Sequence, residues 1–279
     1  MSITDPELTQ IIQAIRSVSS YDFTEYSEKS LKRRFTKILM DYRITTDVLI
    51  HQMRGQKKFV EEIVRKVTVN TTEMFRDPPI WVALRSEILP KLSHKPVIRI
   101  WHSGCSTGQE VYSMIILLNE MGLLEKTELY ASDLNTDAIA VAQKGVYKYK
   151  FNLGYLDNFD KVIRNDIHNP LIVRDIPYKK YFDIDDAGDR LMIQKSFLEK
   201  PHFAKHDLVN DGNIFNVTFD LVMCRNVIIY FNYGLQNKIF QLFYNNLSND
   251  GFLMLGFHES ILGPFSTKFE KRGYYYLKR

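Results

Sequence analysis

From residue 97 onward, short apolar runs alternate with segments of helical periodicity, and this alternation leaves few possible folds. The apolar runs lie at 97–101, 128–133, 219–224 and 251–257. The helical segments lie at 109–121, 135–145 and 234–247. Strands that alternate with helices are typical of βαβ units. The sequence therefore predicts an α/β, Rossmann-like fold with a mostly parallel sheet, which ends in an antiparallel hairpin around Lys271–Gly273.

The first 68 residues follow a different pattern. They contain one glycine and no proline after Pro6, and their apolar residues recur at helical spacing. Asp77-Pro78-Pro79 cannot continue a helix. We therefore expect a helical N-terminal domain with the start of a linker at 1–76, a linker helix at 77–96, and an α/β domain at 97–279. Within that last domain, 178–206 has the composition of a small β insertion.

Composition and charge exclude several classes of protein. With 37 Lys and Arg against 33 Asp and Glu, the net charge of +4 is too small to imply nucleic-acid binding. No apolar run approaches the roughly 18 residues of a membrane span, and the N-terminus does not resemble a signal segment. Cys105 and Cys224 are far apart, and no His pair has metal-ligand spacing. We expect a cytoplasmic protein, without metal or direct membrane insertion and monomeric.

The segment RIWHSGCSTGQEVYSM, residues 99–114, is the strongest local signal. It predicts a strand, a loop of small residues and a helix from Gln109, and ligands of such sheets lie over this turn. Its glycine spacing fits neither a dinucleotide nor a triphosphate loop. Glu110 in the first helical turn competes with phosphate and suits a cation such as the sulfonium of S-adenosylmethionine. Alternatively, Glu110 only complements the helix dipole.

Asp133 ends the next predicted strand, in YASDLN. An acid at this place hydrogen-bonds ribose hydroxyls in this architecture. Its alternative role is to cap the following helix, which Asn135 can do equally well. Together, Glu110 and Asp133 favour S-adenosylmethionine as the ligand.

Six segments together resemble the CheR-type chemotaxis receptor methyltransferases. In chain order they are NTTEMFR, WHSGCSTGQEVYS, YASDLNTDAIAVAQKGVY, FAKHDL, FDLVMCRNVIIYF and GFLMLGFHESI, within residues 70–262. The resemblance implies a class I methyltransferase-like fold with a basic helical N-terminal domain. It also implies a protein-glutamate O-methyltransferase that uses S-adenosylmethionine and releases S-adenosylhomocysteine. Its partners would be the cytoplasmic helices of methyl-accepting chemotaxis receptors.

The resemblance also implies a set of site residues. Arg76 and Tyr230 would face the substrate carboxylate as catalytic residues. The cofactor would contact Asn70, Thr72, Arg76, Glu110, Asp133, Asp207, Leu208, Arg225 and Asn226.

Within this set, each part of the cofactor has its own residues. Glu110 would bind the amino end, Asp133 the ribose, and Asp207–Leu208 the adenine. Arg225–Asn226 would lie at the methionine end. Asp207 departs from the usual asparagine, so a hydrogen-bond donor is lost there. Gln109 departs from the usual glutamate, but the second acid of that motif is kept.

The implied chemistry places modest demands on the site. A glutamate carboxylate, with an ordinary pKa of about 4.3, is ionised at neutral pH, so neither a general base nor a metal is required. The site must align this nucleophile and remove its water, for which Arg76 and Tyr230 are suitable. Alternatively, Arg76 forms a surface ion pair with Glu73 or Asp77, and Tyr230 is an aromatic core residue.

On a helix, Lys29, Arg33 and Lys37 share one face, and no acid lies among them. An ordinary solvated face is one explanation. The resemblance favours docking of acidic receptor helices, so we expect these residues to bind the receptor and call them the basic face. Two other functions stay open: a methyltransferase acting on nucleic acid or a small molecule, and a non-catalytic adaptor that binds S-adenosylmethionine.

Overall fold

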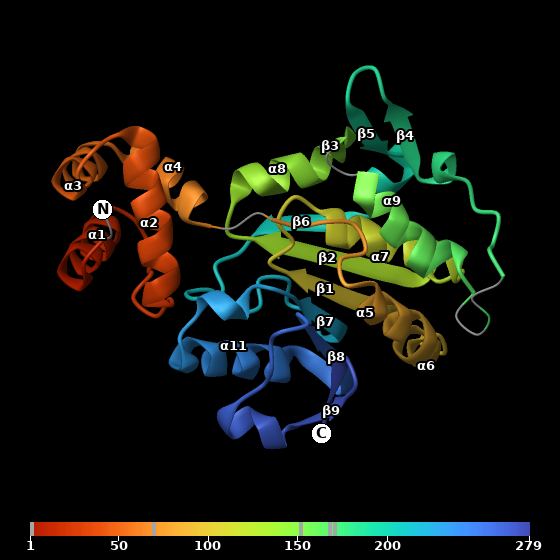
Figure 1. The fold of residues 1–279 in the computed structure, drawn as a ribbon. Coiled ribbons are helices and arrows are strands. Elements are labelled where there is room, and N and C mark those ends of the chain that lie inside the picture. The colour runs from red at the N-terminus through yellow and green to blue at the C-terminus, as the bar shows by residue number, and fades with distance from the viewer. Residues whose placement is uncertain (1–2, 69–70, 151–152, 167–168, 170–171) are drawn as a thin grey trace.

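The computed structural model describes residues 3–68, 71–150, 153–166, 169 and 172–279. A helical bundle lies to one side of the sheet (Figure 1), and its members are α1 (Asp5–Val18), α2 (Glu28–Tyr42), α3 (Thr46–Gly55) and α4 (Lys57–Val67). Their apolar stripes meet in a core of their own, which includes Leu8, Phe35 and Ile63. Because each stripe repeats at helical spacing, the predicted periodicity and the observed helices agree.

The segment after the bundle is helical from residue 78 to 92, in three pieces. These are α5 (Pro78–Ala83), the π-helical η1 (Leu84–Ile88) and α6 (Leu89–Leu92). The sequence predicts a linker helix at 77–96, and the observed helical segment lies within these bounds. It can begin at Pro78 because prolines are tolerated in the first helical turn, where their missing N–H groups have no intrahelical acceptor.

The main sheet has the order β6-β2-β1-β7-β8-β10-β9. Its strands are β1 (Ile98–Ser103), β2 (Thr127–Asp133), β6 (Pro201–Lys205), β7 (Phe219–Cys224), β8 (Leu247–Leu255), β9 (Phe269–Arg272) and β10 (Tyr275–Lys278). The first five in the order pair in parallel, and β10 is antiparallel to both of its neighbours. The predicted fold, a mostly parallel sheet with an antiparallel terminal hairpin, is confirmed.

Both faces of this sheet are buried. Alternate residues of β1 enter different cores: Ile98 and Ile100 pack with α7 (Gln109–Glu120) and the linker helices, whereas Trp101 packs with α11 (Tyr233–Asn246). Helix α8 (Thr136–Lys144) follows β2, and the short η2 (Leu124–Lys126) precedes that strand. Parallel strands buried on both faces leave the carboxyl-terminal edge of the sheet as the place for a ligand.

A second, smaller sheet has the order β3-β5-β4. Its strands are β3 (Val146–Lys148), β4 (Phe182–Asp185) and β5 (Arg190–Ile193), and it lies near α9 (Leu153–Phe159), η4 (Asp160–Arg164), η5 (Tyr178–Lys180) and α10 (Lys195–Leu198) (Figure 1). The predicted insertion, 178–206, includes β6, but β6 pairs with β2 in the main sheet and does not belong to the smaller sheet. The predicted insertion also omits β3, which comes from a distant segment.

Figure 1 shows α2 on the side of the main sheet toward which the arrowheads of β1 and β2 point, that is, toward the carboxyl ends of these strands. Among helices of the described ranges, none has the length and hydropathy needed to cross a bilayer.

Candidate functional site: a cavity between the sheet and helix α2

A cavity lies where the carboxyl ends of four parallel strands meet the N-terminal bundle. The sheet side of its wall is Gly104–Ser106 after β1, Asp133 at the end of β2, His206–Leu208 after β6 and Arg225–Val227 after β7. The bundle side includes Tyr26, Ser30, Leu31 and Arg34, and the linker adds Thr71–Glu73 and Arg76. The cavity therefore lies at the edge that the fold reserves for ligands, with a lid made by another part of the chain.

The loop after β1 is held by backbone hydrogen bonds to the end of β2. The N–H groups of Gly104 and Cys105 both donate to the Ser132 carbonyl, at 2.8 and 2.9 Å. Gly104 has a φ of 80°, and a Cβ there would lie 2.4 Å from Cγ2 of Val227. Only glycine satisfies both demands, which explains why a loop of small residues forms this part of the wall.

Asp133 is fixed by two backbone N–H groups. Its Oδ2 accepts from Ser106 at 2.8 Å, and its Oδ1 accepts from Asn135 at 2.9 Å. The side chain of Asn135 caps α8 by accepting from the N–H groups of Asp137 and Ala138. Burial raises the pKa of Asp133, and the hydrogen bonds from the N–H groups of Asn135 and Ser106 oppose that shift only in part. The cap belongs to Asn135, which leaves the Asp133 carboxylate in the cavity wall.

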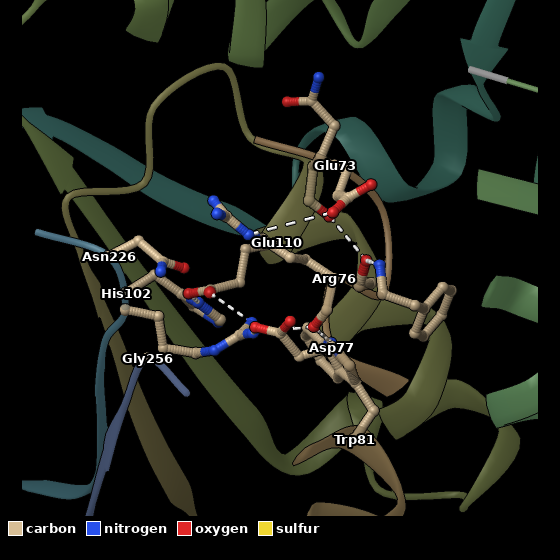
Figure 2. A network of polar contacts seen from close by, with 12 residues as sticks. Glu73, Arg76, Asp77, Trp81, His102, Glu110, Asn226 and Gly256 are labelled. Carbon is tan, nitrogen blue, oxygen red and sulfur yellow. Dashed lines mark hydrogen bonds and ion pairs between the residues drawn. The ribbon is translucent and has the colours of Figure 1, made fainter. Parts of the chain in front are cut away.

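Glu110, in the first turn of α7, belongs to a buried polar network (Figure 2). Its Oε1 lies 2.9 Å from His102 Nδ1, and its Oε2 accepts from Arg225 at 3.1 Å. Because an ionised carboxylate only accepts, His102 Nδ1 carries the proton. Burial alone would raise the pKa of Glu110, but the hydrogen bond from His102 and the charge of Arg225 outweigh it and hold the pKa below its ordinary value.

Arg225 joins this network to the linker. Its side chain is 2% exposed, and its Nη2 donates to Asp77 Oδ2 and to the Arg76 carbonyl, both at 2.8 Å. Its Nε is buried and has no partner in the described part of the chain. Two carboxylates, Glu110 and Asp77, thus share one guanidinium. The Glu110 carboxylate lies in the cavity wall, where it can accept a hydrogen bond from a cationic ligand group.

Arg76 and Tyr230, the two expected catalytic residues, line the same cavity. Arg76 Nη1 donates to the Thr71 carbonyl at 3.4 Å, and its Nε is 4.0 Å from Glu73 Oε1. The ion pair with Glu73 is therefore at its outer limit, while Asp77 is occupied by Arg225. Tyr230 is half-buried, since it packs against the core around α11 and also lines the cavity.

The remaining sequence-derived cofactor residues that the structure describes also reach this cavity. Thr72, Asp207, Leu208 and Asn226 all belong to its wall. The Thr72 carbonyl accepts from the Tyr155 hydroxyl at 2.9 Å. Asp207 is engaged locally, since its Oδ1 accepts from the Val209 N–H at 2.9 Å. Asn70, which the sequence also assigns to the cofactor, lies outside the described residues.

Sequence reasoning missed three residues of the site: His102, Tyr26 and Arg34. The Arg34 guanidinium carbon lies 4.8 Å from the centre of the Tyr230 ring, and its Nη1 donates to the Val67 carbonyl at 2.6 Å. Burial lowers the pKa of Arg34. Arg34 lies on the side of α2 between the exposed cations and the buried apolar stripe, and only its contact with Tyr230 distinguishes it from the neighbouring cations.

The basic face lies outside the cavity wall. Lys29, Arg33 and Lys37 are all exposed, and none forms an ion pair within the described ranges. Helix α2 therefore presents unpaired cations to solvent and Arg34 to the cavity. Within the same ranges, no cluster of His, Cys, Asp or Glu side chains could hold a metal ion.

The donor set fits S-adenosylmethionine. Acidic side chains, Glu110 among them, line the cavity, Asp133 offers acceptors for ribose hydroxyls, and the buried Arg225 Nε has no hydrogen-bond partner among the described residues. The strand order, the position of the cavity and these groups define an S-adenosylmethionine-dependent methyltransferase.

Comparison with known proteins identifies its family. The family pattern for the CheR methyltransferase, SAM binding domain, matches residues 70–154 and 168–275, so the chain belongs to the CheR methyltransferase family. The Pseudomonas putida protein named "Putative methyltransferase Cher3" is 37% identical over 270 residues, which cover 96% of this chain and 93% of that one. The chemotaxis protein methyltransferase of Listeria monocytogenes is 25% identical, covering 87% and 86%. Chemotaxis protein methyltransferase 1 of Vibrio cholerae is 24% identical, covering 97% and 94%.

Proposed function

We propose that this protein methylates glutamate side chains on the cytoplasmic helices of methyl-accepting chemotaxis receptors and forms methyl esters. The observation that carries the proposal is the contact of Arg34 with the Tyr230 ring in a cavity whose wall also includes Arg76. Two arginines and a tyrosine thus line one space. Guanidinium groups match carboxylates through paired donors, so this space suits an acidic side chain better than a neutral amide or a base.

The reaction needs orientation more than activation. S-adenosylmethionine supplies a methyl group on a positively charged sulfur. The substrate carboxylate is already ionised at neutral pH, so the chain has no proton to remove from it. Tyr230 and one arginine would hold one carboxylate oxygen and leave the other free to attack the methyl group, with S-adenosylhomocysteine as the leaving group. The walls from α2 and the linker exclude water from that oxygen, whose hydration would otherwise oppose the attack.

Each end of the cofactor has its own protein groups in this proposal. Glu110 binds the amino group, and His102 and Arg225 keep that carboxylate ionised and oriented. Asp133 accepts from the ribose hydroxyls, with its two backbone donors fixing its plane. Asn70 and Thr72 of the linker, Asp207 and Leu208 at the adenine, and Asn226 at the methionine end complete the set.

The basic face supports a helical, acidic partner. Lys29, Arg33 and Lys37 form an exposed row along α2 with no ion pair to any residue that the structure describes, and Arg34 of the same helix lines the cavity. The N–H of Ser27 donates to the Tyr230 carbonyl at 2.8 Å, which ties the start of α2 to the expected catalytic segment. An acidic helix bound along this row lies at the cavity mouth, where one of its glutamates reaches Tyr230. The chemotaxis names of the Listeria and Vibrio relatives support a receptor as that partner.

The test uses tritiated S-adenosylmethionine and membranes that contain the organism's chemoreceptors. We expect label on a membrane protein, released as methanol by mild alkali because it is held in an ester. Tyr230→Phe should reduce this label strongly while binding S-adenosylhomocysteine as the wild type does. Alkali-stable label on any acceptor, or label on nucleic acid, would refute the proposal.

A further inference from the structure

Glu259 is a buried acid just after β8, and it lies behind the cavity wall instead of in it. It is 7% exposed and has no ion pair within the described residues. Its carboxylate accepts from three backbone N–H groups. Oε2 accepts from Asn226 and from Gly256, both at 2.7 Å, and Oε1 accepts from Ile229 at 3.2 Å. A buried carboxylate without a cationic partner is energetically unfavourable. Its retention at this place therefore suggests a role for the three hydrogen bonds that it accepts.

Those bonds hold the loop that follows β7. Asn226 has a φ of 59°, a left-handed conformation that is unfavourable for a residue with a side chain. A Cβ on Gly256 would lie 2.7 Å from Glu259 Oε2 and 2.9 Å from the Asn226 nitrogen. The close approach of the two segments therefore requires glycine at 256, and it leaves the Asn226 N–H directed at the carboxylate.

The same loop carries the groups that face cofactor and substrate. Arg225 and Asn226 lie in the cavity wall, and Tyr230 follows Ile229, whose N–H is the third donor. Burial raises the pKa of Glu259, and the backbone donors offset this only partly. We propose that Glu259 is a positioning residue of the methyl-transfer site. Its carboxylate holds residues 225–230 in the strained shape that presents Asn226 to the cofactor and Tyr230 to the substrate.

The proposal is tested by affinity for S-adenosylhomocysteine, measured by calorimetry on the full chain. Glu259→Ala should weaken binding at least tenfold, because Asn226 is no longer held. Glu259→Gln should weaken it about threefold, because one amide oxygen can still accept from Asn226 and Gly256 while the amide nitrogen cannot accept from Ile229. Glu120→Ala is the matched control, since Glu120 is also buried, with 5% of its side chain exposed, but lies outside the cavity wall.

A merely structural role predicts a different pattern. In that case the alanine variants at 259 and 120 would both lower the melting temperature and leave the affinity of the folded protein unchanged, and the proposal would be overturned. Should Glu259→Ala not fold, the glutamine variant decides, and wild-type affinity in it would overturn the proposal equally. That Tyr230 faces the substrate rests on the proposed function. The effect of Glu259 on affinity for S-adenosylhomocysteine does not depend on which substrate is methylated. If wild-type protein methylates no receptor glutamate, the proposed function fails while these affinities still test Glu259.

Discussion

Replacement of Arg34 by Met separates a cavity role from a surface role, because Arg33 beside it is a matched control. Arg34 stacks on Tyr230 at 4.8 Å and donates to Ser30 and Val67, whereas Arg33 is exposed. Of the five N–H donors of a guanidinium, two serve these protein acceptors. The others are available to a substrate carboxylate in the cavity.

The expected magnitude follows from those contacts. A charge-assisted hydrogen bond contributes about 1.5–3 kcal/mol, and the stacking on Tyr230 contributes about 0.5–1 kcal/mol. Part of this interaction energy holds the Tyr230 ring in place before the substrate binds, so it does not contribute to transition-state stabilisation. We therefore expect Arg34→Met to lose about 2 kcal/mol of transition-state stabilisation, roughly a 30-fold fall in kcat. Methionine fills similar volume, so the packing of α2 is largely kept.

The assay is initial-rate methylation of a receptor cytoplasmic fragment, with S-adenosylhomocysteine affinity measured in parallel. Arg34→Met should lower kcat and leave that affinity within about threefold of the wild type, because its contacts are to Tyr230 and not to Glu110 or Asp133. Arg33→Met should raise KM for the receptor and spare kcat. Equal effects of the two variants on kcat would refute the assignment of Arg34 to the substrate side of the cavity.

Three further predictions follow from other contacts. Reversal of the basic face to glutamate should abolish receptor methylation and leave S-adenosylhomocysteine affinity intact; an equal loss of affinity would mean that these residues serve the fold. His102→Leu removes the donor to Glu110 and should weaken that affinity about tenfold in calorimetry, whereas His102→Asn, whose amide can replace Nδ1–H, should stay within threefold; similar values for both would contradict the role of this hydrogen bond. Glu120 accepts from Arg174, Lys180 and the Tyr181 hydroxyl. Burial opposes these partners, yet they lower its pKa, so its contribution is present above its unfolded pKa of about 4.3 and lost as pH falls through the lower folded value. Glu120→Ala should cost about 2 kcal/mol in urea unfolding at pH 7, since its cationic partners are partly solvated, and this difference should shrink in acid; a constant difference would count against the ion pairs.

The parts of this fold that local pattern decides were predictable from the sequence. Strand β7 is buried at every residue and β1 at all but Arg99, because both faces of the sheet are covered. Helix α8 is bounded by the Asn135 cap and by Gly145, at a φ of 60°, and both signals are visible in the sequence. The glycine loop and the acids Glu110 and Asp133 were predictable for the same reason, since each is defined by its place after a strand.

The parts that depend on distant pairing were not predictable from local pattern. Strand β3 is three residues long and forms only because Tyr147 pairs with Leu191. The predicted insertion, 178–206, overlaps β6, because nothing local shows that this strand pairs with β2. Arg34 lies in a run of cations, and only the packing of α2 against Tyr230 distinguishes it from Arg33. Glu259 has no sequence signal for its role, because its three donors are backbone groups.

The central claim is that the carboxylate of a receptor glutamate is the methyl acceptor. Its most direct test is mass spectrometry of a purified receptor cytoplasmic fragment after incubation with the protein and S-adenosylmethionine. The account predicts methyl esters on glutamate side chains, lost after alkali and absent with Tyr230→Phe. Methyl groups on nitrogen or sulfur atoms of that fragment, or none on a receptor under conditions where S-adenosylmethionine is consumed, would contradict it.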